Sequence, residues 1–433
     1  MNLGRLLQTR LDSTTKGLPD IGDHEFLLED VPVMGWNVLT GDLPTPLATL
    51  DESALRANSS WMSQFIAGNQ LHICPHGKTT MAPQLFQRQL ADGAWGITVS
   101  NMQQLRVCRK FGVSRVLMAN QLVDEHDIRE LMIILRDDCS FDFRCLVDSM
   151  DNVHRLFAIA NEFQVGRPLQ LLIEGGTQNG RTGCRSLDEA IELARLIDRY
   201  APALELTGVE GFEGVIDSID NKSAEAAVGR FLDYLGGLVT NLLSAGLLRT
   251  PKPLLTIGGS IYFDLVASHP VVALLKNRCD IVLRSGCYLT HDSLMLQDNM
   301  QRIHERSKML GIPASAFRPA LKVWGVIQSI PEPGLAILNV GKRDVSFDIH
   351  LPRAEKWFRR DLHRLPQPMP VMTTTTQIND QHLFLEVPDH SPLRIGDMIG
   401  LGVSHPCTTF DKWRLLYVIN DDYDVTEGIL TFF

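Results

Sequence analysis

A lysine that follows a short buried strand is the first residue of this sequence equipped for covalent chemistry. An apolar run stops at Pro75, and the chain then presents His76 and Lys78 in a loop that contains glycine. An amine placed just past a buried strand can lose hydration, which lowers its pKa and prepares it to form a Schiff base. A solvated loop lysine would leave the same pattern, so the spacing of other residues must decide between the two.

Three further segments place polar or cationic residues directly after apolar runs. Glycine amides beside a helix start can bind an anion, and arginine or tyrosine can add a charge or a hydroxyl. The simpler interpretations are an ordinary glycine turn, a surface salt bridge and a packing aromatic ring. The residues concerned are Arg181 in a glycine-rich turn, then Gly258, Gly259 and Ser260 ahead of an expected helix, and finally Arg284 and Tyr288.

A histidine and a cysteine lie two residues apart near the end of the chain. In an extended segment, His405 and Cys407 would point to the same side. Imidazole and thiolate together suit Zn²⁺, and two ligands are too few for a closed structural site. A metal here would therefore keep open positions for water or substrate. A hydrogen-bonded histidine beside a buried cysteine is the simpler interpretation.

The elements that must position these residues are eight short apolar runs that alternate with helical stretches. The runs are continuous rather than alternating, as in strands that are buried on both faces. We predict strands at Leu71–Pro75, Gly96–Val99, Arg115–Ala119, Phe143–Val147, Leu169–Glu174, Leu206–Val209, Pro253–Ile257 and Asp280–Arg284. We predict helices at Met102–Phe111, Glu125–Leu135, Met150–Phe163, Leu187–Arg199, Lys222–Ala245 and Phe263–Lys276. This α/β pattern predicts a (β/α)8 barrel, with a doubly wound open sheet as the alternative.

The pattern also divides the chain into three parts. We expect residues 1–43 to be an irregular arm that packs with the last domain, residues 44–310 to form the barrel, and residues 311–433 to form an all-β domain. Short strands are expected there at Ala320–Ile330, Leu335–Val340, Pro370–Thr376, His382–Val387, Met398–Val403 and Trp413–Ile419. Residues 353–368 are expected to be a loop. In a barrel, functional residues follow the strand ends, where Lys78, Arg181 and Arg284 stand.

Composition narrows the function further. The 433 residues carry a net charge of −10 without a basic stripe, which argues against nucleic acid and anionic membranes as partners. The first twenty residues lack the apolar core of a signal peptide, and no run is apolar enough to span a membrane. The eight cysteines include no CxxC pair. We therefore expect reduced cysteines in a cytoplasmic protein.

Taken in order, these motifs resemble the alanine-racemase-like (fold type III) enzymes, which use pyridoxal 5′-phosphate (PLP). Within that group, the segment from Pro75 to Thr79 and the pair formed by His405 and Cys407 resemble the D-serine dehydratase and D-threonine aldolase family. The resemblance covers roughly residues 45–425. The lysine motif together with a distant His-x-Cys is specific, whereas either alone would not be.

The resemblance implies a role for each candidate residue. Lys78 would carry PLP as a Schiff base and act as a base at the substrate α-carbon. The phosphate would be held by Gly258, Gly259, Ser260 and Tyr288. Arg181 would lie near the phenolic oxygen of PLP and Arg284 near its pyridine nitrogen. His405 and Cys407 would bind a divalent metal, Zn²⁺, that grips the β-hydroxyl of the substrate.

The implied activity is a lyase that dehydrates D-3-hydroxy amino acids such as D-serine to a 2-oxo acid and ammonia. The alternatives are a D-threonine aldolase that releases glycine and an aldehyde, a racemase, and a non-catalytic PLP-binding protein. Family members commonly have an uncharged residue where Arg284 stands, and a permanent cation there would weaken PLP as an electron sink. Fold type III enzymes pair head-to-tail, so the resemblance also implies a homodimer.

Overall fold

Eight parallel strands form the centre of the larger half of the molecule. The computed structural model describes residues 1–22, 25–216 and 221–433, so residues 23–24 of the predicted arm and 217–220 of the predicted barrel lie outside the described ranges. The strands are β4 (His72–Ile73), β5 (Ile97–Val99), β6 (Arg115–Gln121), β7 (Asp142–Val147), β8 (Leu169–Gly175), β9 (Leu204–Gly211), β10 (Leu254–Thr256) and β11 (Asp280–Leu283). Their order in the sheet is β4-β11-β10-β9-β8-β7-β6-β5. All eight predicted strands are present.

The two ends of this sheet meet, so the fold is a closed barrel rather than an open sheet. A parallel bridge joins His76, just beyond β4, to Thr98 of β5. The amide of Thr98 also donates to the Pro75 carbonyl at 2.9 Å. A separate apolar cluster fills the interior with side chains from different strands, as in a packed barrel: Cys74, Leu117, Leu146, Leu172, Leu254 and Val282.

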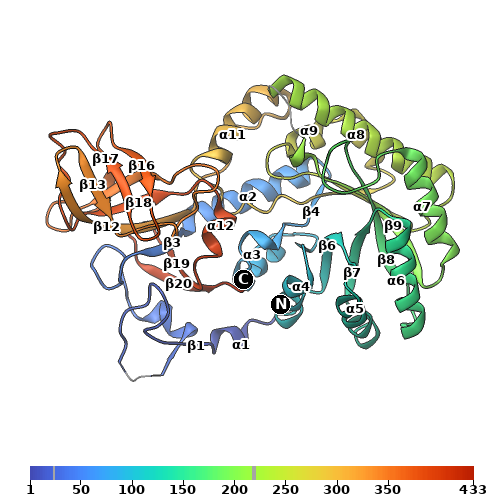
Figure 1. The fold of residues 1–433 in the computed structure, drawn as a ribbon, viewed down its shortest axis with the longest axis horizontal. Coiled ribbons are helices and arrows are strands. Elements are labelled where there is room, and N and C mark those ends of the chain that lie inside the picture. The colour runs from blue at the N-terminus through green and yellow to red at the C-terminus, as the bar shows by residue number, and fades with distance from the viewer. Residues whose placement is uncertain (23–24, 217–220) are drawn as a thin grey trace.

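Helices surround the strands (Figure 1), and side-chain caps explain where several of them begin. They are α4 (Met102–Lys110), α5 (Glu125–Asp137), α6 (Met150–Phe163), α7 (Leu187–Arg199) and α8 (Asn221–Ser244). Asn101, Asp124, Ser149 and Ser186 each accept a hydrogen bond from an amide in the first turn. The predicted helix Phe263–Lys276 is instead two helices, α9 (Phe263–Ser268) and α10 (Pro270–Leu275). The residue before Pro270 is extended, as a following proline requires, and this interrupts the helix.

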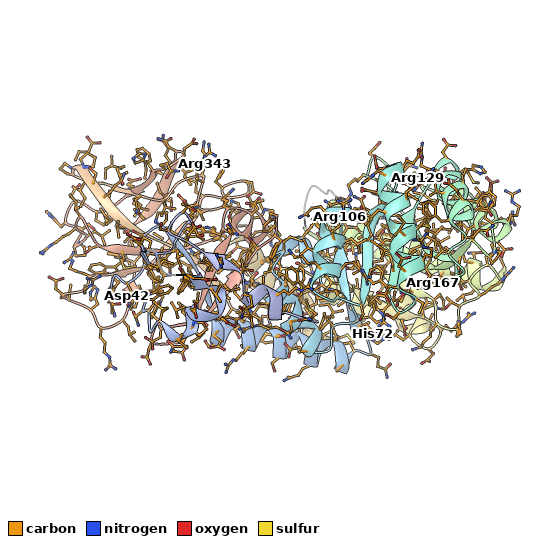
Figure 2. The ribbon with its side chains drawn as sticks, turned by 90° about the horizontal axis from the view of Figure 1, so that it is seen from below. Asp42, His72, Arg106, Arg129, Arg167 and Arg343 are labelled. Atoms are coloured by element: carbon orange, nitrogen blue, oxygen red, sulfur yellow. The ribbon has the colours of Figure 1, made fainter. Side chains whose placement is uncertain are left out.

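A mostly antiparallel β domain lies at the end of the molecule opposite α7 (Figure 1). Its strands are β12 (Leu321–Glu332), β13 (Leu335–Leu338), β14 (Arg353–Phe358), β15 (Gln367–Pro368), β16 (Thr374–Ile378), β17 (Leu383–Glu386), β18 (Met398–Gly402), β19 (Leu415–Ile419) and β20 (Val425–Leu430). The predicted loop at residues 353–368 was wrong, because it contains β14 and β15. Tertiary pairing with β18 makes β14 a strand despite its charged residues. Asp42 and Arg343 lie on this side of the molecule in Figure 2.

Strand β3 (Leu47–Asp51) connects the two halves. It pairs antiparallel with β12 and parallel with β19, so it lies in the sheet of the β domain. Asp51 then caps α2 (Glu52–Gly68), which leads the chain into the barrel. Two helices that we did not predict, α3 (Pro83–Ala91) and α11 (Met295–Arg306), follow β4 and β11. The domain limits at residues 43 and 310 stay predictions. No described helix is long and apolar enough to cross a membrane.

Candidate active site

A cavity of about 160 Å³ lies where the barrel strands end. Seven of the eight strands contribute at least one lining residue at or just beyond their C-terminal end, as expected for the catalytic face of a barrel. It is lined by His76, Lys78, Ser100, Ala119, Asn120, Arg181, Glu210, Phe212, Gly258, Gly259 and Arg284. The structure therefore brings five of our predicted residues together: Lys78, Arg181, Gly258, Gly259 and Arg284.

Lys78 lies in a short turn, η2 (Gly77–Thr79), at the edge of this cavity. Its side chain is exposed, so the protein alone does not strip water from the amine as the sequence suggested. The neighbouring His76 ring is 3.3 Å from the Ser100 hydroxyl. Burial, and then the charges of Lys78 and Arg284, hold the pKa of His76 well below its usual range. A neutral imidazole therefore lies beside an accessible amine.

Arg284 is not isolated, because it is paired with a buried carboxyl group that we did not predict. Arg284 is 5 % exposed, and it forms an ion pair with Glu210, which is 2 % exposed. The guanidinium also donates to the hydroxyl of Thr256 at 3.0 Å and the carbonyl of Gly211 at 3.1 Å. Burial raises the pKa of Glu210 to about 8, while Arg284 opposes that rise. The sequence signal was a glutamate at the C-terminal end of strand β9.

The glycines after β10 do not offer free amides to an anion, which corrects our expectation. The amides of Gly258 and Gly259 donate to the Glu213 carboxylate at 3.1 and 2.7 Å. Burial raises the pKa of Glu213, and those two amides oppose the rise. The next helix begins only at Phe263 and has six residues. The amide of Ser260 has no hydrogen-bond partner within the described part of the chain, so it remains available to a ligand.

Tyr288 also differs from its prediction. It is buried beside Phe317, with the ring centroids 6.5 Å apart, and it does not line the cavity. Burial raises its pKa, and hydrogen bonds with Gln89 and Ser59 oppose that rise. Its hydroxyl therefore faces helices α3 and α2 rather than the cavity. In this position Tyr288 packs between the outer helices and the barrel, and its phosphate-binding role stays a prediction.

The metal motif begins a helix rather than continuing a strand. His405 is the N-cap of α12 (Pro406–Phe410), with Pro406 in the first turn, where a proline fits well. The prediction that the segment is extended was therefore wrong, yet His405 and Cys407 still interact. A hydrogen bond with Cys407 and, to a smaller extent, one with Asp348 raise the pKa of His405 to about 9, although burial by itself lowers it. Nδ1 of His405 is 2.6 Å from the Asp348 carboxylate, which fixes the orientation of the ring.

Cys407 reaches the barrel of its own chain. Its Sγ is 3.6 Å from the hydroxyl of Thr79, the residue that follows Lys78. The same Sγ is 3.7 Å from Sγ of Cys287, in the turn after β11. The hydrogen bond with Cys287, and the charge of His405, hold the pKa of Cys407 well below its usual range. An imidazole and a thiolate thus meet directly beside the lysine turn.

The comparisons with known proteins agree with this geometry. Residues 50–251 match the model of the alanine racemase N-terminal domain, and residues 320–419 match that of the putative serine dehydratase domain. The chain is a fold type III enzyme. It is 26 % identical to a D-threo-3-hydroxyaspartate dehydratase of Delftia sp. over 319 residues, which are 73 % of this chain and 76 % of that protein. It is 23 % identical to a D-threonine aldolase of Arthrobacter sp. over 380 residues, which are 87 % of this chain and 89 % of that protein.

A solved structure extends the similarity to the whole fold. The crystal structure of D-threonine aldolase from Filomicrobium marinum superposes with a TM-score of 0.71 at 18 % identity, covering 91 % of this chain and 97 % of that one. The chain is a PLP-dependent lyase of this family. Both the dehydratase and the aldolase interpretations are supported by these relatives.

The cavity of this fold type III enzyme fits PLP. Lys78 offers an accessible amine, and the Arg181 guanidinium lies over the Phe212 ring at 5.4 Å. The buried Oε2 of Glu210 has no hydrogen-bond partner among the described residues, so a polar group in the cavity could satisfy it. These groups provide a covalent anchor, positive charge and an unsatisfied polar atom.

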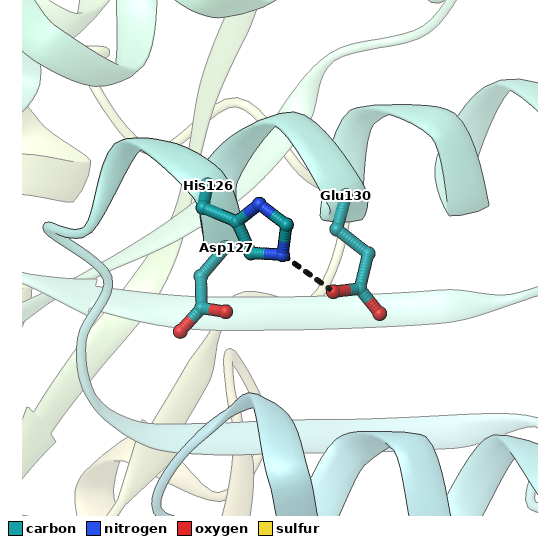
Figure 3. A group of neighbouring side chains, drawn as sticks. All are labelled: His126, Asp127 and Glu130. Atoms are coloured by element: carbon teal, nitrogen blue, oxygen red, sulfur yellow. Dashed lines mark ion pairs between the residues drawn. The ribbon is translucent and has the colours of Figure 1, made fainter.

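A second group of metal-ligand types occurs among the described residues, but it is not part of this site. His126, Asp127 and Glu130 lie together on one face of α5 (Figure 3). Arg106, on the barrel side in Figure 2, pairs with Asp127 at 3.1 Å and with Glu130 at 2.5 Å. An arginine thus already compensates both carboxylates, and we interpret the group as a surface ion-pair cluster.

Proposed function

We propose that this lyase dehydrates D-3-hydroxy amino acids of the D-serine kind to a 2-oxo acid and ammonia, with PLP on Lys78 and a divalent metal at His405 and Cys407. One observation carries the proposal. The Cys407 thiol is 3.6 Å from Thr79, directly after Lys78, so the proposed metal ligands would lie beside the lysine turn. A substrate held at the lysine would have its β-hydroxyl within reach of that pair.

The residues of the chain would divide the chemistry between them. When bound, PLP supplies an electron sink for the α-carbon, and a Zn²⁺ ion supplies a Lewis acid for the β-oxygen. Lys78 would hold the aldehyde carbon of the cofactor and move the proton at the substrate α-carbon. His76 is neutral and adds no charge beside that amine. Arg181 would face the phenolic oxygen of the cofactor from its position over Phe212.

The Glu210–Arg284 pair answers an objection to this chemistry when Glu210 is ionised. An unpaired arginine at the pyridine nitrogen would weaken PLP as an electron sink. Glu210 pairs with Arg284 in the same cavity, and it balances the charge of Arg284 once the pH exceeds the Glu210 pKa of about 8. At such a pH the arrangement is compatible with removal of an α-proton. It also gives no support to a racemase over a lyase.

D-Threonine aldolase activity is the second candidate. The similarity to aldolases from Arthrobacter sp. and Filomicrobium marinum favours it as much as the Delftia sp. enzyme favours dehydration. The same metal pair would hold the hydroxyl oxygen during carbon–carbon cleavage. A non-catalytic PLP carrier would have no use for a His-x-Cys pair beside its lysine.

Product analysis tests the proposal. Purified, PLP-loaded protein is incubated with D-serine, D-threonine and their L-enantiomers, with and without EDTA, and 2-oxo acid, ammonia and glycine are measured. We expect EDTA-sensitive 2-oxo acid and ammonia from the D-enantiomers. Borohydride reduction followed by peptide mass spectrometry should find the pyridoxyl group on Lys78. Glycine with an aldehyde would establish the aldolase instead, and no turnover with labelled Lys78 would refute the substrate class.

A further inference from the structure

A second thiol lies beside the proposed metal-binding pair. Cys287 follows Arg284 in the turn after β11, and its Sγ is 3.7 Å from Sγ of Cys407. It is also 3.8 Å from the hydroxyl of Thr79. Of the remaining six cysteines, five are buried and Cys139 is exposed. All six are free cysteines in the described structure.

The separation of the two sulfur atoms matches a shared metal ion. Two thiolates on one tetrahedral Zn²⁺, each at about 2.3 Å, lie about 3.8 Å from one another. A disulfide would require about 2.05 Å instead. Side chains from a barrel turn and from the β domain therefore already stand at the spacing of two ligands, 120 residues apart in sequence.

Gly286 explains how Cys287 reaches this position. A Cβ atom on Gly286 would lie 2.6 Å from the carbonyl oxygen of His76 and 2.6 Å from the hydroxyl of Thr79. The absence of a side chain thus lets the turn after β11 run directly against the lysine turn. Cys287, the next residue, therefore lies beside the first turn of α12, which contains Cys407.

A buried carboxylate with an unsatisfied oxygen gives a second, independent indication of a cation. Asp292 is 0 % exposed, and its Oδ1 accepts the amides of Leu294 and Leu296 at 2.9 Å each. Its Oδ2 has no hydrogen-bond partner among the described residues. The amide of His291 donates to the Cys287 carbonyl at 2.7 Å, and the amide of Ser293 donates to the Val403 carbonyl at 3.0 Å, so Asp292 lies between the turn of Cys287 and the segment that leads to His405. A buried acceptor of this kind is usually satisfied by a cation or by water.

We propose that Cys287 is a third ligand of the metal ion that His405 and Cys407 hold, which makes a site of two thiolates and one imidazole. The inference rests on the metal dependence in the proposed function. Three protein ligands leave the fourth position of a tetrahedral ion for water or the substrate hydroxyl, as in catalytic zinc sites. The second thiolate selects a borderline-soft ion such as Zn²⁺ over Mg²⁺ or Mn²⁺.

Cobalt substitution counts the thiolate ligands directly. The PLP-loaded holoenzyme is dialysed against a chelator and reloaded with Co²⁺. The sulfur-to-cobalt charge-transfer absorption is then measured per bound ion. Borohydride reduction of the protein beforehand removes the overlapping absorption of the cofactor. We expect Cys287→Ser and Cys407→Ser each to lose about half of the intensity, because each removes one of two thiolates. The exposed Cys139→Ser is the matched control and should keep all of it.

Cys287→Asp separates a ligand from a packing residue. A carboxylate can still bind the ion, so this variant should keep Co²⁺ in a one-to-one ratio while losing about half of the charge-transfer intensity. It also provides the test if Cys287→Ser fails to fold. Full intensity in either folded Cys287 variant would overturn the inference and leave the two-residue metal site intact. If the wild-type holoenzyme binds no Co²⁺ or Zn²⁺, the metal dependence of the proposed function fails as well.

Discussion

The ion pair between Glu210 and Arg284 controls the charge of the cavity. Both side chains are buried, so water screens neither of them. Breaking a buried ion pair is costly because the remaining charge has no partner, whereas removing both charges costs much less. We therefore expect the contributions of the two side chains to the free energy of unfolding to depend on one another.

A double-mutant cycle tests this coupling. At about pH 9, where Glu210 of the wild type is ionised, we expect Glu210→Gln to lower the free energy of unfolding by about 3–5 kcal/mol, because the buried Arg284 guanidinium then has no charged partner. The double variant Glu210→Gln/Arg284→Met should lose clearly less than the sum of the two single variants. Urea unfolding measures all four proteins. Additive losses would show that the two side chains act independently.

Glu210 also predicts how stability depends on pH. Burial raises its pKa from 4.5 to about 8 in the folded chain, so the folded protein keeps a proton that the unfolded chain releases between these values. This contribution to stability is fully present below about pH 4.5 and is lost as the pH rises through about 8. The wild type should therefore lose more stability over this range than Glu210→Gln, whose amide does not titrate. Urea unfolding at several pH values measures the difference, and parallel pH profiles would contradict it.

At the scale of elements, the turns between regular structures position the chemistry. The lysine turn η2, the turn after β11 and helix α12 come from separate parts of the chain and touch at Thr79. Helix α12 is decisive because Pro406 starts it directly after His405 and turns Cys407 toward the barrel. Close packing among these turns leaves little room for added atoms.

Gly286→Ala tests this close approach. The added methyl group would overlap the His76 carbonyl and the Thr79 hydroxyl, so we expect the lysine turn to shift, at a cost of about 1–3 kcal/mol of stability. The fraction of protein that carries PLP on Lys78 after borohydride reduction should fall with it. Gly237→Ala is the matched control, because nothing lies within 4 Å of its Cβ position in α8. Equal PLP incorporation in both variants would refute this role of Gly286.

At the scale of the whole molecule, the C-terminal strand fixes the β domain against the barrel. Glu427 of β20 pairs with Arg88 of α3, and Gln84 donates to the Gly428 carbonyl at 2.9 Å. The amide of Phe432 donates to the carbonyl of Met81, near the lysine turn, also at 2.9 Å. These contacts hold the proposed metal-binding segment at a defined distance from Lys78 within one chain.

Assembly gives the last prediction. We propose a head-to-tail homodimer, because the chain has the fold of alanine-racemase-like enzymes along nearly its whole length. Light scattering during size-exclusion chromatography should therefore give about twice the mass of one chain. A mass of one chain at micromolar concentration, with full activity, would contradict this assembly.

Much of the architecture could be predicted from local sequence patterns. Continuous apolar runs predicted all eight barrel strands, and capping residues such as Ser149 and Ser186 marked helix starts, because both signals depend on neighbours in the chain. The resemblance to fold type III enzymes was likewise carried by short motifs around Lys78 and His405. Strand β14 could not be predicted from such patterns because its pairing with β18 outweighs its own charged residues.

The tertiary structure alone decided which distant groups meet. Closing the barrel buried Glu210 with Arg284 and gave the Gly258 and Gly259 amides to Glu213. Docking of the β domain placed Cys407 beside Cys287, 120 residues away in the sequence. Burial, charge compensation and metal geometry depend on positions in space, and no local pattern of residues encodes those positions. The sequence determined the fold and its lysine, and packing determined the electrostatics and the ligands around it.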